Sequence, residues 1–148
     1  MKTEARLKKI TKVLNNKQSN LSIVLENIHD PHNVSAILRT CDAVGILNVN
    51  LLYTKESFPL INQKSSASAN KWINIDKYDN IQKLKNNILT SNNNIYATSM
   101  DEKSTSIFDV DWTKPSIIVM GNENRGISNE LIAVCKKQIF IPMAGMVQ

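Results

Sequence analysis

The stretch IVLENIHDPHNVSAILRTCDAVGI, residues 23–46, has the most informative pattern in this 148-residue chain. An apolar run over residues 21–26 predicts a buried strand, and a polar loop containing Pro31 follows it. Residues 34–44 then favour a helix, with Gly45 placed where helices commonly end. The order of strand, polar loop and helix predicts a βα unit. Its loop should be stiff, because proline fixes its own φ and restricts the residue before it.

The same alternation continues along the rest of the chain. Further strands are predicted over residues 49–53, 72–75, 95–98, 117–120 and 139–141. Helices are predicted over residues 3–14, 61–69, 81–89 and 128–135, the last with Ser128 as its N-cap. Strands alternating with helices indicate an α/β fold with a mostly parallel sheet and helices on both of its faces. No internal repeat or linker divides this sheet.

Composition and charge narrow the class of protein. With 42% hydrophobic and only 5% aromatic residues, the chain can bury a core that is mainly aliphatic. The formal net charge of +5 favours a polyanionic partner such as RNA, although a modest excess of lysine is also common in ordinary soluble enzymes. Residues 1–20 hold a predicted basic helix that carries Lys8, Lys9 and Lys12. We expect this segment to precede a larger domain over residues 21–148.

Several other classes of protein are disfavoured. Cys41 and Cys135 lie in apolar helical patterns without metal-ligand spacing, so both are expected to be reduced thiols. His29 and His32 have no third ligand at a suitable spacing, and no metal site is predicted. The sequence has no apolar run of about 18 to 20 residues and no secretory signal, which predicts a cytoplasmic protein without a membrane span.

Two later segments repeat the pattern of an apolar strand that runs into a polar loop. They are IIVMGNENRGISNEL, residues 117–131, and IFIPMAGMVQ, residues 139–148. The carboxyl ends of parallel strands meet at one edge of a sheet, and ligands of α/β proteins bind at that edge. We therefore expect all three loops to meet at one site.

Each loop also has an ordinary structural interpretation. Asn33 can cap the predicted helix while Arg39 is a solvated surface charge. Gly121 and Gly126 can flank a common strand-to-helix turn. Glu123 can stabilise the dipole of the helix that follows, and the methionines of the last segment can fill the core. The residues alone leave these alternatives open.

Taken together, the motifs NIHDPHNVSAILRTCDAVG, GNENRGI and IPMAGMVQ resemble those of the SpoU, or TrmH-like, family of RNA ribose 2′-O-methyltransferases. The resemblance runs from about residue 6 to residue 148. It implies a SPOUT-type α/β fold with a deep trefoil knot, S-adenosylmethionine as cofactor, tRNA as substrate and a homodimer. The first and third motifs and SASANKW, residues 66–72, look closest to the members that methylate the ribose of guanosine-18 in the tRNA D-loop.

The resemblance also implies roles for individual residues. Arg39 and Asn33 match the catalytic positions, and Arg39 is expected to hold the target phosphate as a bidentate clamp, because a guanidinium keeps its proton. The expected cofactor-binding residues are Thr98, Gly121, Asn122, Glu123, Gly126, Ile141, Met143 and Met146, with Gly145 beside them. The expected RNA-binding residues are Lys8, Lys9, Lys12, Lys64 and Lys71.

The family's third motif continues with Ser-Leu-Asn and a knot-closing helix, which do not follow Gln148 in this sequence. We therefore expect the chain to be a C-terminally truncated fragment. A non-catalytic tRNA-binding protein and a methyltransferase acting on another tRNA or rRNA ribose are the alternatives. A nucleotide-binding oxidoreductase is disfavoured, because the dinucleotide fingerprint is missing.

Overall fold

The computed structural model describes residues 3–61, 69–89 and 93–145. The strands in these ranges are β1 (Gln18–Glu26), β2 (Ile46–Leu52), β3 (Asn74–Tyr78), β4 (Asn94–Thr98), β5 (Thr105–Ser106), β6 (Ser116–Met120) and β7 (Lys137–Phe140). The helices are α1 (Glu4–Asn15), α2 (Pro31–Val44), α3 (Ile81–Asn87) and α4 (Asn129–Ile132), with 3-10 turns η1 (Ala69–Lys71) and η2 (Ile107–Asp109).

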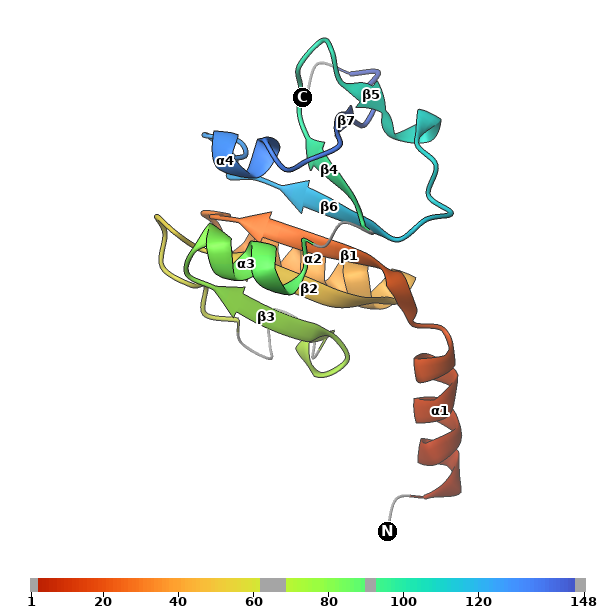
Figure 1. Cartoon of the computed structure of the whole chain (residues 1–148). Helices are drawn as coiled ribbons and strands as arrows, with labels where there is room; N and C mark the ends of the chain where they lie inside the picture. The colour runs from red at the N-terminus through yellow and green to blue at the C-terminus, as the bar shows by residue number, and fades with distance from the viewer. Residues whose placement is uncertain (1–2, 62–68, 90–92, 146–148) are drawn as a thin grey trace.

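Within the described residues, the strands form one seven-stranded sheet in the order β3-β2-β1-β6-β4-β7-β5 (Figure 1). Each pair of neighbouring strands is parallel. The carboxyl ends of all the strands therefore lie along one edge of the sheet. The mostly parallel α/β sheet expected from the sequence is confirmed.

The side chains of β1 alternate between two apolar cores on opposite faces of the sheet. Ile23 and Leu25 lie in one core, to which α2 adds Val34 and Leu38. Val24, between them in sequence, lies in the other core. Successive strand residues point to opposite faces, so this continuous apolar strand needs cover on both sides.

Helices α3 and α4 supply that cover on the second face. Leu84 of α3 and Leu131 of α4 are fully buried in the core that also contains Val24, Ala97 and Val119. Helices therefore pack on both faces of the sheet, as the sequence predicts.

The ends of α2 follow from its sequence. Asp30 is the N-cap and accepts a hydrogen bond from the backbone N–H of His32 at 2.8 Å, with Pro31 at the first helical position. Gly45 ends the helix at φ 83°, a left-handed conformation that glycine adopts without strain. The predicted helix end at Gly45 is confirmed, whereas Asn33 lies inside the helix and is not its cap.

Helix α1 projects from the rest of the chain at the lower right of Figure 1, and none of its residues is buried. A hydrogen-bonded ion pair anchors the segment that follows it, because Lys17 Nζ lies 2.8 Å from Asp42 Oδ1 of α2. Within the described ranges, no helix has both the length and the apolar content needed to cross a membrane.

Some predicted boundaries are wrong. The strand predicted over residues 72–75 corresponds to β3, which begins two residues later, at Asn74. The 3-10 turn η1 occupies residues 69–71, just before the predicted start. The helix predicted over residues 128–135 ends at Ile132, and its Ser128 N-cap makes no side-chain capping hydrogen bond. The helix predicted over residues 61–69 falls largely outside the described residues.

Candidate active site

A pocket with a volume of about 620 Å³ opens at the carboxyl edge of the sheet, beside the ends of β4, β6 and β7. Of the predicted cofactor-binding residues, those that line it are Thr98, Gly121, Asn122, Glu123, Gly126, Ile141 and Met143. Gly145, expected beside them, does not line the pocket, and Met146 lies outside the described residues. Of the three loops expected to meet at one site, the second and third line this pocket, whereas no residue of the first loop lines it.

Further residues line this pocket, and the sequence predicts a role in the site for none of them. They are Ser99, Met100, Ile107, Ile118, Met120, Asn124, Arg125, Ile127, Ile132, Ile139 and Phe140. Several are apolar side chains, such as Ile118 and Ile139, for which the hydrophobic pattern predicts only a place in a strand. Ile141 and Met143 are 54% and 57% exposed, so Met143 does not fill the core. An exposed methionine at a pocket mouth is instead available to contact a ligand.

The loop after β6 folds back on itself as a tight hairpin. The backbone groups of Asn122 and Gly126 exchange two hydrogen bonds, of 3.1 and 2.8 Å. A Cβ atom at Gly121 would lie only 2.3 Å from the Gly126 carbonyl carbon, so no side chain fits at position 121. Glycine is therefore required there for the close approach of two backbone segments.

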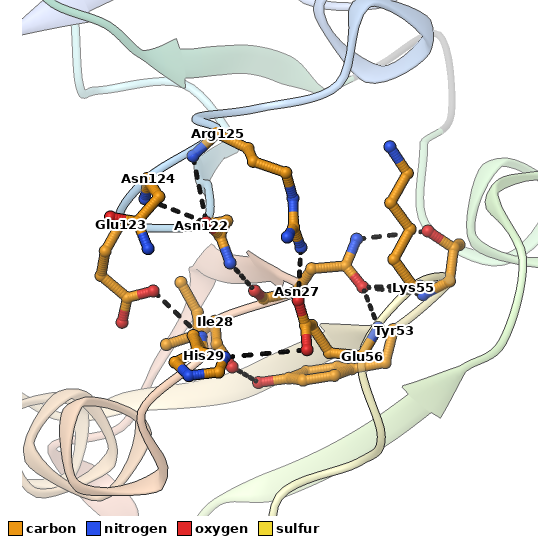
Figure 2. A network of polar contacts seen from close by, with 11 residues as sticks. Asn27, Ile28, His29, Tyr53, Lys55, Glu56, Asn122, Glu123, Asn124 and Arg125 are labelled. Carbon is orange, nitrogen blue, oxygen red and sulfur yellow. Dashed lines mark hydrogen bonds and ion pairs between the residues drawn. The ribbon is translucent and has the colours of Figure 1, made fainter.

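The side chain of Asn122 organises this loop and fastens it to the neighbouring strand. Its Oδ1 accepts the backbone N–H groups of Asn124 and Arg125 at 2.9 and 3.0 Å. Its Nδ2 donates to the main-chain carbonyl of Asn27 at 2.7 Å. Asn122 is only 5% exposed, so its polar atoms depend on these partners (Figure 2).

The side chain of Asn27 connects the end of β1 to the loop after β2. Asn27 directly follows β1, is buried, and has a φ of 49°, a left-handed conformation that asparagine tolerates better than most residues. Its Oδ1 accepts the backbone N–H groups of Thr54, Lys55 and Glu56 at 2.9, 3.0 and 3.2 Å. Asn27 therefore joins the loops after β1, β2 and β6, although nothing within its motif distinguishes it from the neighbouring polar residues.

Glu123 connects the pocket to the start of α2. Its Oε2 accepts the backbone N–H of His29 at 3.0 Å, and its Oε1 accepts Asn33 Nδ2 at 2.8 Å. Partial burial raises the pKa of the Glu123 carboxyl, but these hydrogen bonds outweigh burial and hold the pKa below its ordinary value. The carboxylate thus lies beside the start of α2 and not at the start of the helix that follows it in sequence.

A different carboxylate occupies the start of that following helix. Glu26, the last residue of β1, is 3% exposed, and its Oε2 accepts the backbone N–H of Ser128 at 2.7 Å. The sequence pattern predicts only a strand position for Glu26. Glu26 therefore satisfies the N–H of the residue before α4, while the Ser128 side chain makes no capping bond.

Tyr53, the residue after β2, holds the loop after β1 in place. Its hydroxyl donates to the Ile28 carbonyl at 2.9 Å. Burial, with the nearby charges of Glu123 and Glu56, raises the pKa of Tyr53 to about 12. The phenol therefore remains protonated at neutral pH and anchors the loop after β1.

Arg39 lies on α2 with an exposed side chain and does not line the pocket. Six residues of helix separate it from Asn33, which corresponds to roughly 9 Å along the axis and to a different side of the helix. The structure thus brings Asn33 to Glu123 and leaves Arg39 on the outer surface of α2. Its catalytic role remains a prediction.

The lysines expected to bind RNA are distributed over two regions. Lys8, Lys9 and Lys12 are exposed on α1, where Lys8 pairs with Glu4 at 2.8 Å. Lys71 is exposed in η1, and Lys64 lies outside the described residues. Among the residues that the structure describes, no cluster of three or more His, Cys, Asp or Glu is arranged to hold a metal ion.

A family model described as the SpoU rRNA Methylase family matches residues 20–148. The tRNA (guanosine(18)-2'-O)-methyltransferase of Thermus thermophilus is 39% identical to this chain over 147 residues, which are 99% of this chain and 75% of that protein. The enzyme of the same name from Escherichia coli K12 is 33% identical over 143 residues, which are 97% of this chain and 62% of that protein.

Solved structures show the same similarity. The crystal structure of the Aquifex aeolicus TrmH/SpoU tRNA modifying enzyme superimposes with a TM-score of 0.83 at 39% identity, covering 97% of this chain and 73% of that one. An AdoMet-bound rRNA methyltransferase from Sinorhizobium meliloti has a TM-score of 0.76 at 22% identity, covering 99% of this chain and 63% of that one. The second similarity concerns the fold alone.

Proposed function

The chain belongs to the SpoU rRNA methylase family, and we propose that it methylates the ribose 2′-hydroxyl of guanosine-18 in tRNA with S-adenosylmethionine as donor. One observation carries this proposal. The predicted cofactor-binding residues Thr98, Gly121, Asn122, Glu123, Gly126, Ile141 and Met143 line one pocket at the carboxyl edge of the sheet. Sequence identity of 39% with the Thermus thermophilus enzyme over nearly the whole chain supports the same reaction.

The pocket is suited to the cofactor in size and chemistry. Its volume of about 620 Å³ falls within the range typical of small-molecule sites. Apolar side chains such as Ile107 and Ile139 suit the uncharged parts of the donor, and the backbone of residues 121–126 offers polar groups. The bound donor would supply an electrophilic methyl group on its sulfonium. The protein's own task is then to hold the target hydroxyl in line with that group.

We assign the target ribose to Arg39 and Asn33. Arg39 would clamp a phosphate next to the target ribose through two parallel hydrogen bonds and so fix the 2′-oxygen. Asn33 would keep the loop before α2 aligned with the pocket, a role supported by its bond to Glu123. In the transfer that this arrangement would support, the 2′-oxygen would take the methyl group, S-adenosylhomocysteine would leave with the sulfur electron pair, and the hydroxyl proton would pass to solvent.

We also propose that α1 guides the tRNA. Its exposed Lys8, Lys9 and Lys12 stand on a helix that projects from the sheet, where they are accessible to phosphates (Figure 1). Lys64 and Lys71 would extend this contact. The protein would act in the cytoplasm as a homodimer, so that one subunit's Arg39 works beside the pocket of the other. The exposed position of Arg39, outside its own pocket, supports this arrangement.

The direct test is to incubate the protein with unmodified tRNA and methyl-labelled S-adenosylmethionine, and then to map the label. We expect a 2′-O-methyl group at guanosine-18. Label on another ribose of tRNA or rRNA would keep the reaction and change the substrate. Label on a base, or tRNA binding without transfer or cofactor binding, would contradict the proposal; the latter result would favour a non-catalytic binding protein.

A further inference from the structure

A closed ring of polar contacts links the ends of three neighbouring strands, β2, β1 and β6. Asn27 binds the loop after β2 through three backbone N–H groups, and Asn122 binds the loop after β6 through two (Figure 2). The bond between Asn122 Nδ2 and the Asn27 carbonyl joins these two anchors. An ion pair between Glu56 and Arg125 closes the ring on the outside.

The ion pair connects residues whose backbones are already fixed. The N–H of Glu56 is held by Asn27 and the N–H of Arg125 by Asn122. Glu56 Oε1 lies 2.5 Å from the Arg125 guanidinium, and the Glu56 side chain is 26% exposed. The fixed backbones hold the two side chains within reach of each other, so the pair joins the loop after β2 to the loop after β6.

Arg125 is also a wall of the pocket, together with its loop neighbours Glu123 and Asn124. Glu56 belongs to none of the motifs and does not line this pocket. Its other carboxylate oxygen, Oε2, lies 3.7 Å from Nδ1 of His29, in the loop that opens α2. Glu56 therefore contacts both loops that flank the site without contributing to the pocket surface itself.

We propose that Glu56 is a positioning residue: through its ion pair with Arg125, it holds the loop of residues 121–126 in the shape that binds S-adenosylmethionine. This inference rests on the proposed function and concerns the same site. Glu56 acts on cofactor affinity through Arg125 and has no contact with RNA in this role. Its removal affects the binding of the cofactor and leaves the binding of tRNA unchanged.

The test is a double-mutant cycle read out by calorimetry with S-adenosylmethionine. Glu56→Gln raises the cofactor Kd by about fivefold, the upper range for a partly exposed pair, and Arg125→Gln raises it by at least as much, because Arg125 also lines the pocket. The double variant raises the Kd no further than Arg125→Gln alone does, because the ion pair is already absent from that variant. Exchanging the charges, with Glu56→Arg and Arg125→Glu together, recovers part of the affinity.

Two controls separate positioning from general destabilisation. Asp79→Asn removes another exposed ion pair, to Lys83 on α3, and leaves the cofactor Kd unchanged. The Kd of Glu56→Gln for tRNA and its kcat at saturating cofactor equal those of the unaltered protein, so only the KM for the cofactor rises.

The outcomes are distinguishable. If the unaltered protein binds S-adenosylmethionine and the effects of the single variants multiply in the double variant, the inference is wrong while the proposed function stands. The same conclusion follows if Glu56→Gln leaves the cofactor Kd unchanged or weakens tRNA binding instead. An unaltered protein that binds no cofactor overturns the proposed function and this inference together.

Discussion

Asn122 Nδ2 donates a hydrogen bond of 2.7 Å to the main-chain carbonyl of Asn27, and both residues are 5% exposed. The two residues are 95 positions apart in the sequence, yet they follow neighbouring strands of the sheet. This bond fixes the loop after β6, which forms one wall of the pocket, to the loop that leads into α2. The position of the pocket wall is therefore coupled to the position of α2, the helix that carries Arg39.

Replacing the donor of this bond tests its importance. Asn122→Asp keeps an oxygen for the N–H groups of Asn124 and Arg125 but turns another oxygen toward the Asn27 carbonyl. A buried carbonyl without its donor costs about 1 to 3 kcal/mol of unfolding free energy. We expect a loss of that size in chemical denaturation, together with weaker binding of S-adenosylmethionine in calorimetry.

The matched control for that variant is Asn74→Asp on β3. It makes the same chemical change where Asn74 Nδ2 donates to Asn48 Oδ1 at 3.1 Å on an exposed surface. Water replaces an exposed partner, so the free energy of unfolding should change by less than about 0.5 kcal/mol. Equal losses for the two variants would show that burial of the Asn122 bond has no special effect.

Glu123 should make the stability of the protein depend on pH. Its pKa in the folded protein lies below the ordinary value of 4.5. A carboxyl with a lowered folded pKa stabilises the protein above its unfolded pKa, and this contribution is lost as the pH falls through the folded value. The difference in unfolding free energy between the unaltered protein and Glu123→Gln should be constant near neutral pH and shrink as the pH falls below the ordinary pKa of 4.5. A difference that stays constant down to about pH 3 would contradict this coupling.

Gly121 should accept no side chain. Gly121→Ala places a Cβ atom 2.3 Å from the backbone of Gly126, so the loop must open. We expect loss of cofactor binding and a drop in thermal midpoint. Gly126→Ala is the comparison, because a Cβ atom there meets nothing within 4 Å and only the φ of 67° is unfavourable, at roughly 1 to 2 kcal/mol. If Gly126→Ala is the more damaging variant, close backbone packing is not the reason for glycine at position 121.

Arg39 should affect methyl transfer and not cofactor binding. Its side chain is exposed on α2 and does not line the pocket, so Arg39→Ala should abolish transfer while the cofactor Kd stays within about twofold. Arg39→Lys keeps the charge but lacks the planar fork that holds a phosphate with two bonds, and we expect it to rescue little activity. Near-normal transfer by Arg39→Ala would exclude the clamp.

The lysines of α1 should control the salt dependence of tRNA binding. Replacing Lys8, Lys9 and Lys12 by glutamine removes up to three charges that neutralise phosphates. The slope of log Kobs against log salt should then become less steep by roughly 0.7 to 0.9 for each phosphate that is no longer neutralised. A control variant with Lys103, Lys114 and Lys137 replaced, three exposed lysines outside α1, should keep the original slope. Equal slopes for both variants would mean that α1 has no particular role.

The regular elements and the place of the pocket could be predicted because their signals are local. Apolar runs such as residues 117–120 mark buried strands, and Gly45 marks a helix end. The rule that the ends of parallel strands meet at one edge then predicts that Thr98, Gly121 and Ile141 come together. These are properties of short segments and of sheet topology.

The connections between the loops could not be predicted in the same way. Asn27, Glu26 and Glu56 act through partners 27 to 102 positions away in the sequence. Nothing in their neighbouring residues distinguishes them from surface polar residues or from the last residue of a strand. The alternative that places Glu123 at the helix following it is wrong for the same reason, since its partners His29 and Asn33 precede it by 94 and 90 positions.

A crystal structure of the protein with S-adenosylhomocysteine, the demethylated product, tests the central claim most directly. We predict that the ligand lies in the pocket between Thr98, Gly121 and Ile141, with the Asn122–Asn27 hydrogen bond intact. A ligand bound elsewhere on the chain, or one that fits only after this bond is broken, would contradict the account.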